Sequence, residues 1–230
     1  SEPEGGEVTL LRSQLEKRAG IFACDEQAIF SPAKSFKLGD GPHGPVYTRR
    51  IKHLVQVKGS TGIPGQTTNS WLNTESFMKV WEGVLKDGRF WSHDWVVKVD
   101  PDAVLFPDRL RLHLKPHTSK KALYVRNCDH IPVIQLLGAI EIFSREAMQL
   151  YYDNKWKCES KLPWKGWGED YYMQHCMDEQ LHVAYVDDYK LLGCAGCDFA
   201  PCEDGWRAAF HPFKTPAAYW ECWHKSIAKK

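Results

Sequence analysis

The sequence predicts an α/β fold, with one domain built on a mostly parallel central sheet. Short apolar runs alternate with amphipathic helical stretches from residue 20 to residue 186, and this alternation is typical of a sheet covered by helices on both faces. A chain of 230 residues suits one well-packed domain. We assign this domain to residues 20–230 and treat residues 1–19 as a polar N-terminal lead-in with a short helical stretch near Leu10 to Arg18. The last 40 residues, rich in cysteine, glycine and aromatic residues, should form a disulfide-pinned segment over the carboxyl edge of the sheet.

The first elements are short and interrupted by loops. Residues 20–25 form an apolar run that ends in Asp25, which predicts a buried strand whose carboxyl end reaches a binding edge. Glycine and proline recur over residues 31–45 and predict a loop. Residues 51–57 fit a second strand and residues 59–66 a second loop.

The clearest helix begins near Asn73, which can cap the first free N–H groups of the helix. Apolar residues recur after it at three- and four-residue intervals and share one face; they are Phe77, Val80, Trp81, Val84 and Leu85. A Val-rich strand over residues 95–99 follows and delivers Asp100 and Asp102 to its end. Pro101 cannot donate to a sheet ladder, so the strand must stop or bulge there.

The second half of the chain continues the alternation. Pro107 marks a helix start, and Ser144 caps a later helix whose inward face should carry Ala147, Met148, Tyr151 and Tyr152. A third helix begins at Gly168 with two acidic residues in its first turn. Strands over residues 122–126, 138–143 and 182–186 complete the predicted sheet.

Charge and composition limit the classes of partner. The formal net charge is +1, so no global field favours nucleic acid or a membrane surface. Ten tryptophans and nine tyrosines suit the apolar faces of sugar rings as well as protein cores, the latter being the commoner use. Because no segment is apolar enough to span a bilayer and no signal peptide opens the sequence, we expect any membrane anchor to lie outside it. The oligomeric state is left open.

Eight cysteines at irregular spacing favour disulfide bonds in an oxidising compartment. They are Cys24, Cys128, Cys158, Cys176, Cys194, Cys197, Cys202 and Cys222. The alternative is a zinc site built on Cys194 and Cys197 with Cys202 or Cys222. Structural zinc sites usually show two short paired spacings and only one is present here, so we favour oxidised cysteines.

Acidic residues at two predicted element boundaries could carry chemistry. Asp100 and Asp102 are ordinary turn residues, but a buried strand that runs straight into two carboxylates favours a site for Mn²⁺ or Mg²⁺. Glu169 and Asp170 could simply match the dipole of their helix. The aromatic, Gly-rich approach before them favours a ligand site instead, in which an ionised carboxylate accepts a proton from an attacking hydroxyl. His211, among aromatic residues, is on spacing alone a weak metal-ligand candidate.

Four segments in fixed order resemble the fringe and β1,3-galactosyltransferase family of inverting GT-A glycosyltransferases, most closely its core 1 galactosyltransferase branch. The segments are Lys98-Val-Asp100-Pro-Asp102, Gly138-Ala139 through Ser144-Arg-Glu-Ala147, Glu169-Asp170 and His211-Pro212-Phe213. The resemblance covers roughly residues 70–213. It implies a GT-A fold, metal ligation by Asp100, Asp102 and His211, and Asp170 as the catalytic base.

Two departures from the family pattern affect the predicted pocket. Pro101 replaces the central one of three consecutive aspartates, and Trp167 with Gly168 replaces a more usual Gly-Pro. We place the binding of the donor nucleotide sugar on Asp25, Lys98, Asp100, Trp167 and Glu169.

The resemblance implies a Golgi or secretory-pathway enzyme that transfers a hexose from a UDP-sugar, with UDP-galactose favoured, to a hydroxyl of a glycan or glycoprotein. Mn²⁺ or Mg²⁺ would be the cofactor. A retaining GT-A transferase is the nearest alternative, since it would use the same metal site without Asp170 as base. A carbohydrate-binding lectin with a structural cation is the alternative outside enzymes, and it would leave the nucleotide sugar intact.

Overall fold

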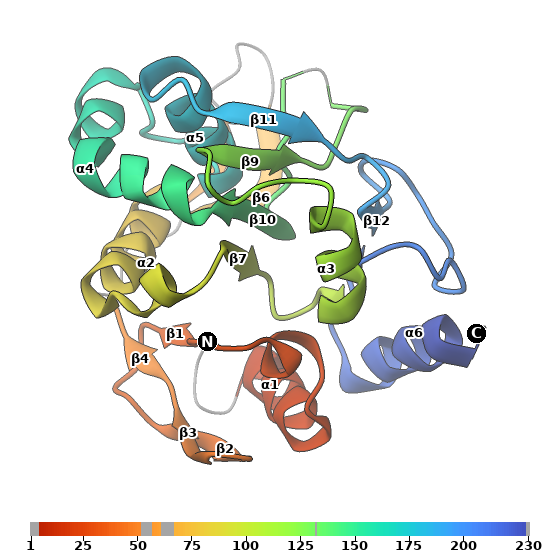
Figure 1. Ribbon diagram of the computed structural model, residues 1–230. Helices are drawn as coiled ribbons and strands as arrows, with labels where there is room; N and C mark the ends of the chain where they lie inside the picture. The colour runs from red at the N-terminus through yellow and green to blue at the C-terminus, as the bar shows by residue number, and fades with distance from the viewer. Residues whose placement is uncertain (1–4, 52–56, 61–66, 132, 229–230) are drawn as a thin grey trace.

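The computed structural model describes residues 5–51, 57–60, 67–131 and 133–228 and has a mixed α/β architecture (Figure 1). The main sheet has the order β11-β9-β10-β7 and consists of β7 (Trp95–Val99), β9 (Leu123–Arg126), β10 (Ile140–Ser144) and β11 (Ala184–Asp187). A smaller sheet of order β12-β13-β8 consists of β8 (Val104–Leu105), β12 (Leu192–Cys194) and β13 (Ala209–His211). The α/β class predicted from the sequence is confirmed.

The strand directions differ from the mostly parallel sheet that we expected. Strand β10 runs antiparallel to both β7 and β9, and only β11 and β9 are parallel in this sheet. Parallel neighbours need a long crossover, usually a helix. The described residues between β9 and β10 contain no helix, so this connection returns the chain in the opposite direction.

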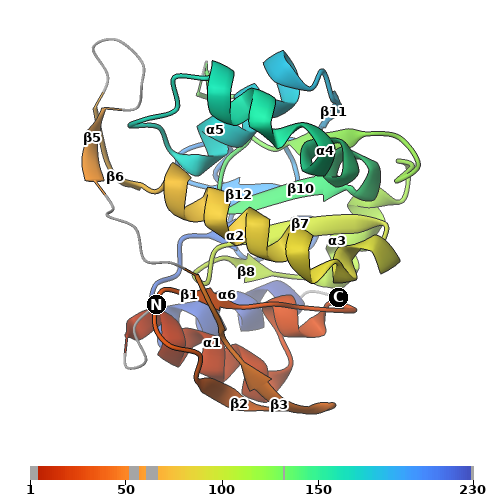
Figure 2. The ribbon, with the colours of Figure 1, turned by 90° about the vertical axis from the view of Figure 1, so that its left-hand side faces the viewer.

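Side chains alternate between the two faces of the main sheet and build two separate cores. Tyr124 and Phe143 belong to the core beneath α2 (Thr74–Asp87), α4 (Arg145–Lys161) and α5 (Glu169–His175). Val125 and Ile142 point the other way and pack with residues of α3 (Pro107–Leu114) and the smaller sheet. Figure 2 shows α4 and α5 above the sheet, with α1 and α6 (Pro216–Ala228) on the opposite side.

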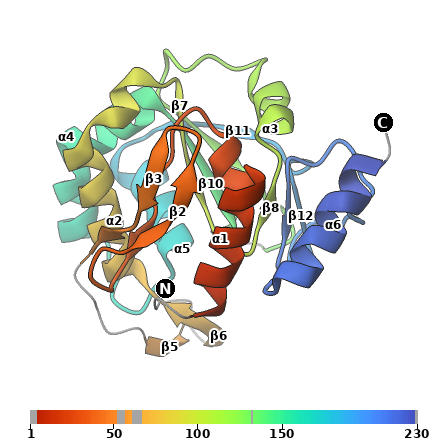
Figure 3. The same cartoon turned by 90° about the horizontal axis from the view of Figure 1, so that it is seen from below.

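The N-terminal segment, expected to be a polar lead-in with a short helical stretch over residues 10–18, contains helix α1 (Gly6–Lys17), which belongs to the packed domain. One face of α1 is buried and carries Val8, Leu10, Leu11, Gln14 and Leu15. Figure 3 shows α1 beside a hairpin of β2 (Lys37–Gly41) and β3 (Gly44–Tyr47) and next to α6. The boundary placed at residue 20 therefore falls inside the packed unit, while residues 1–4 lie outside the described residues.

Several other early elements also differ from the sequence prediction. The expected strand over residues 20–25 is a single 3₁₀ turn, η1 (Gly20–Ala23), and the expected loop over residues 31–45 contains most of the β2–β3 hairpin. Most of the expected strand over residues 51–57 lies outside the described residues. The remaining elements are β1 (Phe30–Ser31), β4 (Arg49–Arg50), β5 (Val57–Ser60), β6 (Thr67–Leu72), η2 (Arg89–Ser92) and η3 (Cys176–Gln180).

Most of the predicted helix starts are confirmed. Pro107 opens α3, and the Ser144 Oγ caps α4 by accepting a hydrogen bond from the Ala147 N–H at 3.1 Å. Asn73 precedes α2 as expected, but its side chain makes no capping bond to that helix. Tyr152, expected on the inward face of α4, is half exposed because that position lies at the rim of the buried stripe.

Six of the eight cysteines form disulfide bonds, which join Cys128 to Cys197, Cys158 to Cys176 and Cys202 to Cys222. The C-terminal segment is therefore pinned as predicted, whereas Cys24 and Cys194 are free thiols, contrary to the expectation that all would be oxidised. The zinc alternative fails because its other members are all in disulfides. Three disulfides indicate an oxidising, secretory-type environment. Within the described part of the chain, no helix is long and apolar enough to cross a membrane.

Candidate active site

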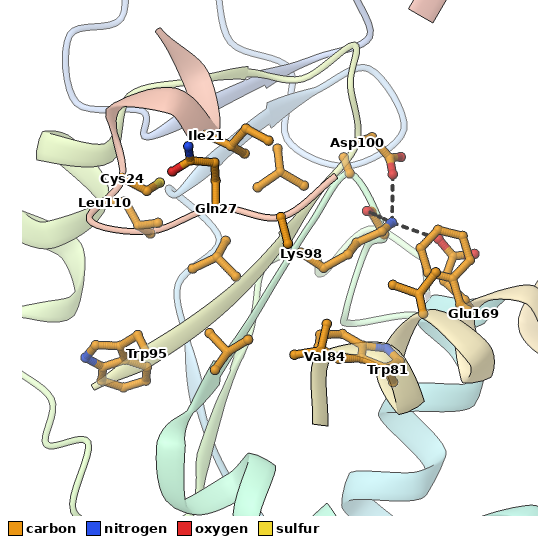
Figure 4. A pocket seen from close by; sticks show the side chains of 18 of the residues that line it. Ile21, Cys24, Gln27, Trp81, Val84, Trp95, Lys98, Asp100, Leu110 and Glu169 are labelled. Carbon is orange, nitrogen blue, oxygen red and sulfur yellow. Dashed lines mark hydrogen bonds and ion pairs between the residues drawn. The ribbon is translucent and has the colours of Figure 1, made fainter. Parts of the chain in front are cut away.

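A cavity of about 1860 Å³ runs along β7, along one face of α2 and over the start of α5. Its lining includes the acidic residues of both predicted clusters and His211. Figure 4 shows Lys98 reaching from β7 into the part of this cavity that Asp100 and Glu169 border. The volume of the cavity exceeds the usual range for a site that holds one small ligand.

The structure brings together the three residues that the sequence proposed as metal ligands. One potential ligand atom each from Asp100, Asp102 and His211 lies within 4.8 Å of the others, and this is the one such group among the described residues. Two ligands on opposite sides of an ion with bonds of about 2.0–2.6 Å are about 4–5 Å apart. Carboxylate oxygens and an imidazole nitrogen are common ligands of divalent cations in proteins. The geometry and chemistry of the three residues therefore fit a divalent cation.

Three backbone contacts hold the loop that carries the two aspartates. The Asp100 N–H donates to the Ala139 carbonyl at 3.1 Å, and the Phe213 N–H donates to the Asp102 carbonyl at 2.8 Å. The Gln14 side-chain amide donates to the Pro101 carbonyl at 2.8 Å. The loop is thus anchored to the residue before β10, to the segment after β13 and to α1.

His211 lies at the end of β13 with Asp102 on one side of its ring and Cys194 on the other. Its Nε2 is 3.4 Å from the Asp102 Oδ1, and its Nδ1 is 3.7 Å from the Cys194 Sγ. Burial alone would lower the pKa of His211, but the hydrogen bonds to Asp102 and Cys194 outweigh it and raise the pKa to about 9. Burial would raise the pKa of Asp102, but His211 and Lys214 hold it below its usual value.

Lys98 joins the metal-ligand group to the second acidic cluster. Its Nζ is 2.7 Å from the Asp100 Oδ1 and 2.8 Å from the Glu169 Oε1, as the dashed lines in Figure 4 mark, and it also donates to the Gly138 carbonyl. Burial would lower the pKa of Lys98, but the charges of Asp100, Glu169 and Glu141 raise it well above its usual value. Lys98 is therefore a buried cation shared between the two clusters.

Glu141 is a site residue that our sequence reasoning missed. It lies directly opposite Lys98 in the β7–β10 ladder, is fully buried, and places its Oε1 3.6 Å from the Lys98 Nζ. Neither of its carboxyl oxygens has a hydrogen-bond partner, and burial raises its pKa well above the usual value. The available signal was a single acid inside the otherwise apolar run from residue 139 to residue 143.

Asp170 lies in the first turn of α5 and is oriented by two backbone groups. Its Oδ2 accepts a hydrogen bond from the Gly138 N–H at 3.1 Å, and its Oδ1 accepts one from the Tyr171 N–H at 2.8 Å. Burial, and next the charge of Glu169, raise the pKa of Asp170 to about 6. A carboxylate with this pKa can hold a proton near neutral pH more readily than an ordinary aspartate.

The start of α2 positions the start of α5. The Asn73 Oδ1 accepts a hydrogen bond from the Glu169 N–H at 3.3 Å, and the Thr74 hydroxyl donates to the Trp167 carbonyl at 2.6 Å. Asn73 thus satisfies an N–H group of α5 rather than one of its own helix. These two bonds fix the backbone that carries Glu169 and Asp170.

The structure separates two predicted donor-binding residues from this group. Trp167 is buried, packs against Tyr171 and His175, and does not line the cavity. Asp25 lines the cavity, but its exposed carboxylate forms an ion pair with Arg111 at 3.1 Å.

Comparisons with known proteins do not assign this chain to a family. No family model and no curated protein matches the sequence. Among solved structures, the chain is similar to the crystal structure of a glycosyltransferase involved in the glycosylation of the major capsid of PBCV-1. The similarity has a TM-score of 0.42 with 12% sequence identity, over 72% of this chain and 81% of the other. At this level of similarity, we base the function on the side chains of the site alone.

Proposed function

We propose that this protein is a metal-dependent glycosyltransferase that moves a hexose from a UDP-sugar to a hydroxyl of a glycan or glycoprotein acceptor, with inversion at the sugar. The observation that carries the proposal is the convergence of Asp100, Asp102 and His211 from distant parts of the chain. The cavity that holds them also contains Asp170. A cation site and a partly buried carboxylate in one cavity are the two groups that this reaction needs.

The two clusters would act at opposite ends of the displacement. Asp100, Asp102 and His211 would hold Mn²⁺ or Mg²⁺, and the bound cation would neutralise charge on the departing diphosphate. Asp170 would accept the proton of the acceptor hydroxyl as the oxygen attacks the anomeric carbon. The Gly138 and Tyr171 N–H groups aim the Asp170 carboxylate. Lys98 would keep the two acidic clusters in a fixed relation while it partly offsets their charge.

The finer features of the proposal rest on the sequence resemblance. It favours UDP-galactose as the donor and a Golgi location, and it implies inversion because Asp170 falls where the family has its catalytic base. The disulfides support only the broader secretory-type environment. Lys98, Asp100 and Glu169 remain our choice for contacts to the donor.

The direct test is a screen of sugar nucleotides for metal-dependent release of UDP. We expect one UDP-sugar to release UDP with Mn²⁺, and EDTA to abolish that release. Asp102→Asn should remove both the activity and the Mn²⁺-dependent binding of UDP, because it deletes an anionic ligand. Asp108→Asn is the matched control, since Asp108 carries a fully exposed carboxylate on the nearby helix α3.

If every sugar nucleotide in the panel stays intact and the protein still binds glycans, the protein is a lectin and not a transferase. If Asp102→Asn keeps its activity, the cation does not bind at Asp100, Asp102 and His211. The anomeric configuration of the product separates the remaining alternatives, because an α-linked donor should give a β-linked product from an inverting enzyme and an α-linked product from a retaining one.

A further inference from the structure

Cys194 stands out because it remains a free, buried thiol in direct contact with a candidate metal ligand. It is 7% exposed and lies at the end of β12, where its Cα is the ladder partner of the His211 Cα in β13. The Cys194 Sγ is 3.7 Å from the His211 Nδ1, within the range of a hydrogen bond to sulfur. The other ring nitrogen of His211, Nε2, is 3.4 Å from the Asp102 Oδ1.

The two sides of the His211 ring therefore have different surroundings. The Nε2 side faces the carboxylate of a second candidate ligand, and the Nδ1 side faces sulfur. An imidazole binds a metal through a nitrogen that carries no proton, and its other nitrogen usually donates an N–H bond to an acceptor behind it. That acceptor fixes both the tautomer and the orientation of the ring.

We propose that Cys194 is a positioning residue for the cation site, and this inference rests on the metal site of the proposed function. The Cys194 Sγ accepts the Nδ1–H bond of His211 and thereby leaves the Nε2 lone pair directed toward the site shared with Asp100 and Asp102. Cys194 itself does not bind the metal.

The surroundings of Cys194 hold its sulfur in place. Its N–H donates to the Asp198 carbonyl at 3.1 Å, and its own carbonyl accepts from the Cys197 N–H at 3.1 Å. The preceding residue, Gly193, is so close to the Phe210 ring that an added Cβ would lie 2.8 Å from the Phe210 Cδ1. The two strands thus pack tightly at the residues that precede Cys194 and His211.

The pairing of the other cysteines explains why this thiol is available to His211. Cys197, only three residues away, forms its disulfide with Cys128 rather than with Cys194. A disulfide at Cys194 would replace the thiol with a more bulky and weakly accepting group beside the ring. The free state of Cys194 is therefore a requirement of the role that we assign to it.

The test is Mn²⁺ binding to the intact protein without nucleotide, measured from the electron paramagnetic resonance signal of the free ion and by calorimetry. We expect Cys194→Ala to weaken Mn²⁺ binding by about 10- to 100-fold, the usual effect of removing the partner behind a ligand. Cys194→Ser should lie between Cys194→Ala and the unmodified protein, because its shorter side chain keeps an acceptor farther from Nδ1. Cys24→Ala, which removes the other free thiol, should leave the affinity unchanged.

Nitrogen NMR of the His211 ring provides a second readout that loss of packing would not change. With diamagnetic Mg²⁺ bound in place of Mn²⁺, the unmodified protein should carry the proton on Nδ1, and Cys194→Ala should lose this tautomer preference. A folded Cys194→Ala variant with normal affinity and normal tautomer would overturn the inference. If His211→Ala and Asp102→Ala also leave Mn²⁺ binding unchanged, then the metal site of the proposed function is wrong. If those two variants weaken binding and Cys194→Ala does not, only the role of Cys194 fails.

Discussion

Gln14 and Pro101 are 87 positions apart in sequence, yet the Gln14 Nε2 donates a hydrogen bond to the Pro101 carbonyl at 2.8 Å. Pro101 lies between the two aspartates of the candidate cation site. Gln14 is itself almost fully buried on the inner face of α1. The N-terminal helix therefore supports the site directly.

We expect Gln14→Leu to weaken Mn²⁺ binding by about fivefold, because one hydrogen bond contributes about 1 kcal/mol to the order of the aspartate loop. Calorimetry with Mn²⁺ and UDP measures this change. Gln149→Leu on α4 is the matched control, since Gln149 bonds only to Asp153 at the surface. Equal affinities of the two variants would show that α1 does not order the loop.

Gly138→Ala should reduce turnover by tenfold or more while the protein still folds. A Cβ at this position would lie 2.9 Å from the Glu169 Oε1 and 3.3 Å from the Asp170 Oδ2, so the Glu169 carboxylate must shift from the Lys98 ammonium and the Asp170 carboxylate from the Gly138 N–H. A misplacement of this size is enough to lower a rate about 100-fold. Steady-state kinetics and thermal unfolding check the result. Gly6→Ala is the control, because its Cβ meets nothing within 4 Å, and equal turnover of the two variants would contradict the expected crowding.

Asp170→Asn should lose about 100-fold or more in turnover and keep its affinity for UDP and Mn²⁺, since a positioned base contributes about that much. The base must be ionised to accept a proton. Because the pKa of Asp170 is raised to about 6, turnover of the unmodified enzyme should fall about tenfold per pH unit below that value and level off above it. The residual turnover of Asp170→Asn should not fall in this way as the pH is lowered. An active variant would favour the retaining alternative.

The stability of the protein should depend on the charge of His113. The His113 Nδ1 lies 2.6 Å from the Asp188 Oδ2 and its Nε2 lies 2.8 Å from the Trp206 carbonyl. Burial would lower the pKa of His113, but these two acceptors raise it above its usual value. The doubly protonated ring is thus favoured in the folded state, so its stabilisation is complete below about pH 6.5 and is lost as the pH rises through the folded-state pKa.

Urea unfolding between about pH 6 and pH 9 measures this loss. His113→Leu cannot be protonated and should show a flatter profile over the same range. If the two profiles have the same slope, His113 does not contribute to the pH dependence.

The unfolded protein should have two alkylatable thiols before reduction. Cys24 and Cys194 are free and the other six cysteines are paired. Intact mass after alkylation in denaturant gives the count directly, and the same sample after reduction should give all eight cysteines of the sequence. No reactive thiol in the unreduced sample would contradict the free state of Cys194.

The sequence predicted those features whose signals are local. A strand that ends in Asp100 and Asp102, a helix capped by Ser144 and an acidic first turn at Asp170 each depend on residues within one or two turns of chain. Spacing alone made His211 a weak candidate for a metal ligand, and only the family resemblance supported this role. The ladder between β13 and β8 explains its position, because it places the end of β13 beside the loop that follows β7.

The features that escaped prediction depend on long-range packing. Residues 20–25 are apolar, but a run this short does not distinguish a strand from a buried turn. A short helix was expected over residues 10–18, but the burial of α1 in the domain was not, because polar neighbours obscured the stripe of Val8, Leu11 and Leu15. Glu141 and Cys194 acquire their significance only from the register of their strands, which places them opposite Lys98 and beside His211.

The Cys128–Cys197 disulfide closes a covalent ring across 69 positions of the chain. Gly138, Glu169 and Asp170 lie inside this ring, whereas Asp100 and His211 lie on the two chain segments that leave it. A protease that cut the turn between α4 and α5 would therefore produce two fragments that stay linked until both the Cys128–Cys197 and the Cys158–Cys176 disulfides are reduced. The candidate base thus lies within the loop that the Cys128–Cys197 disulfide closes. The candidate cation ligands lie on the two chain segments outside that loop.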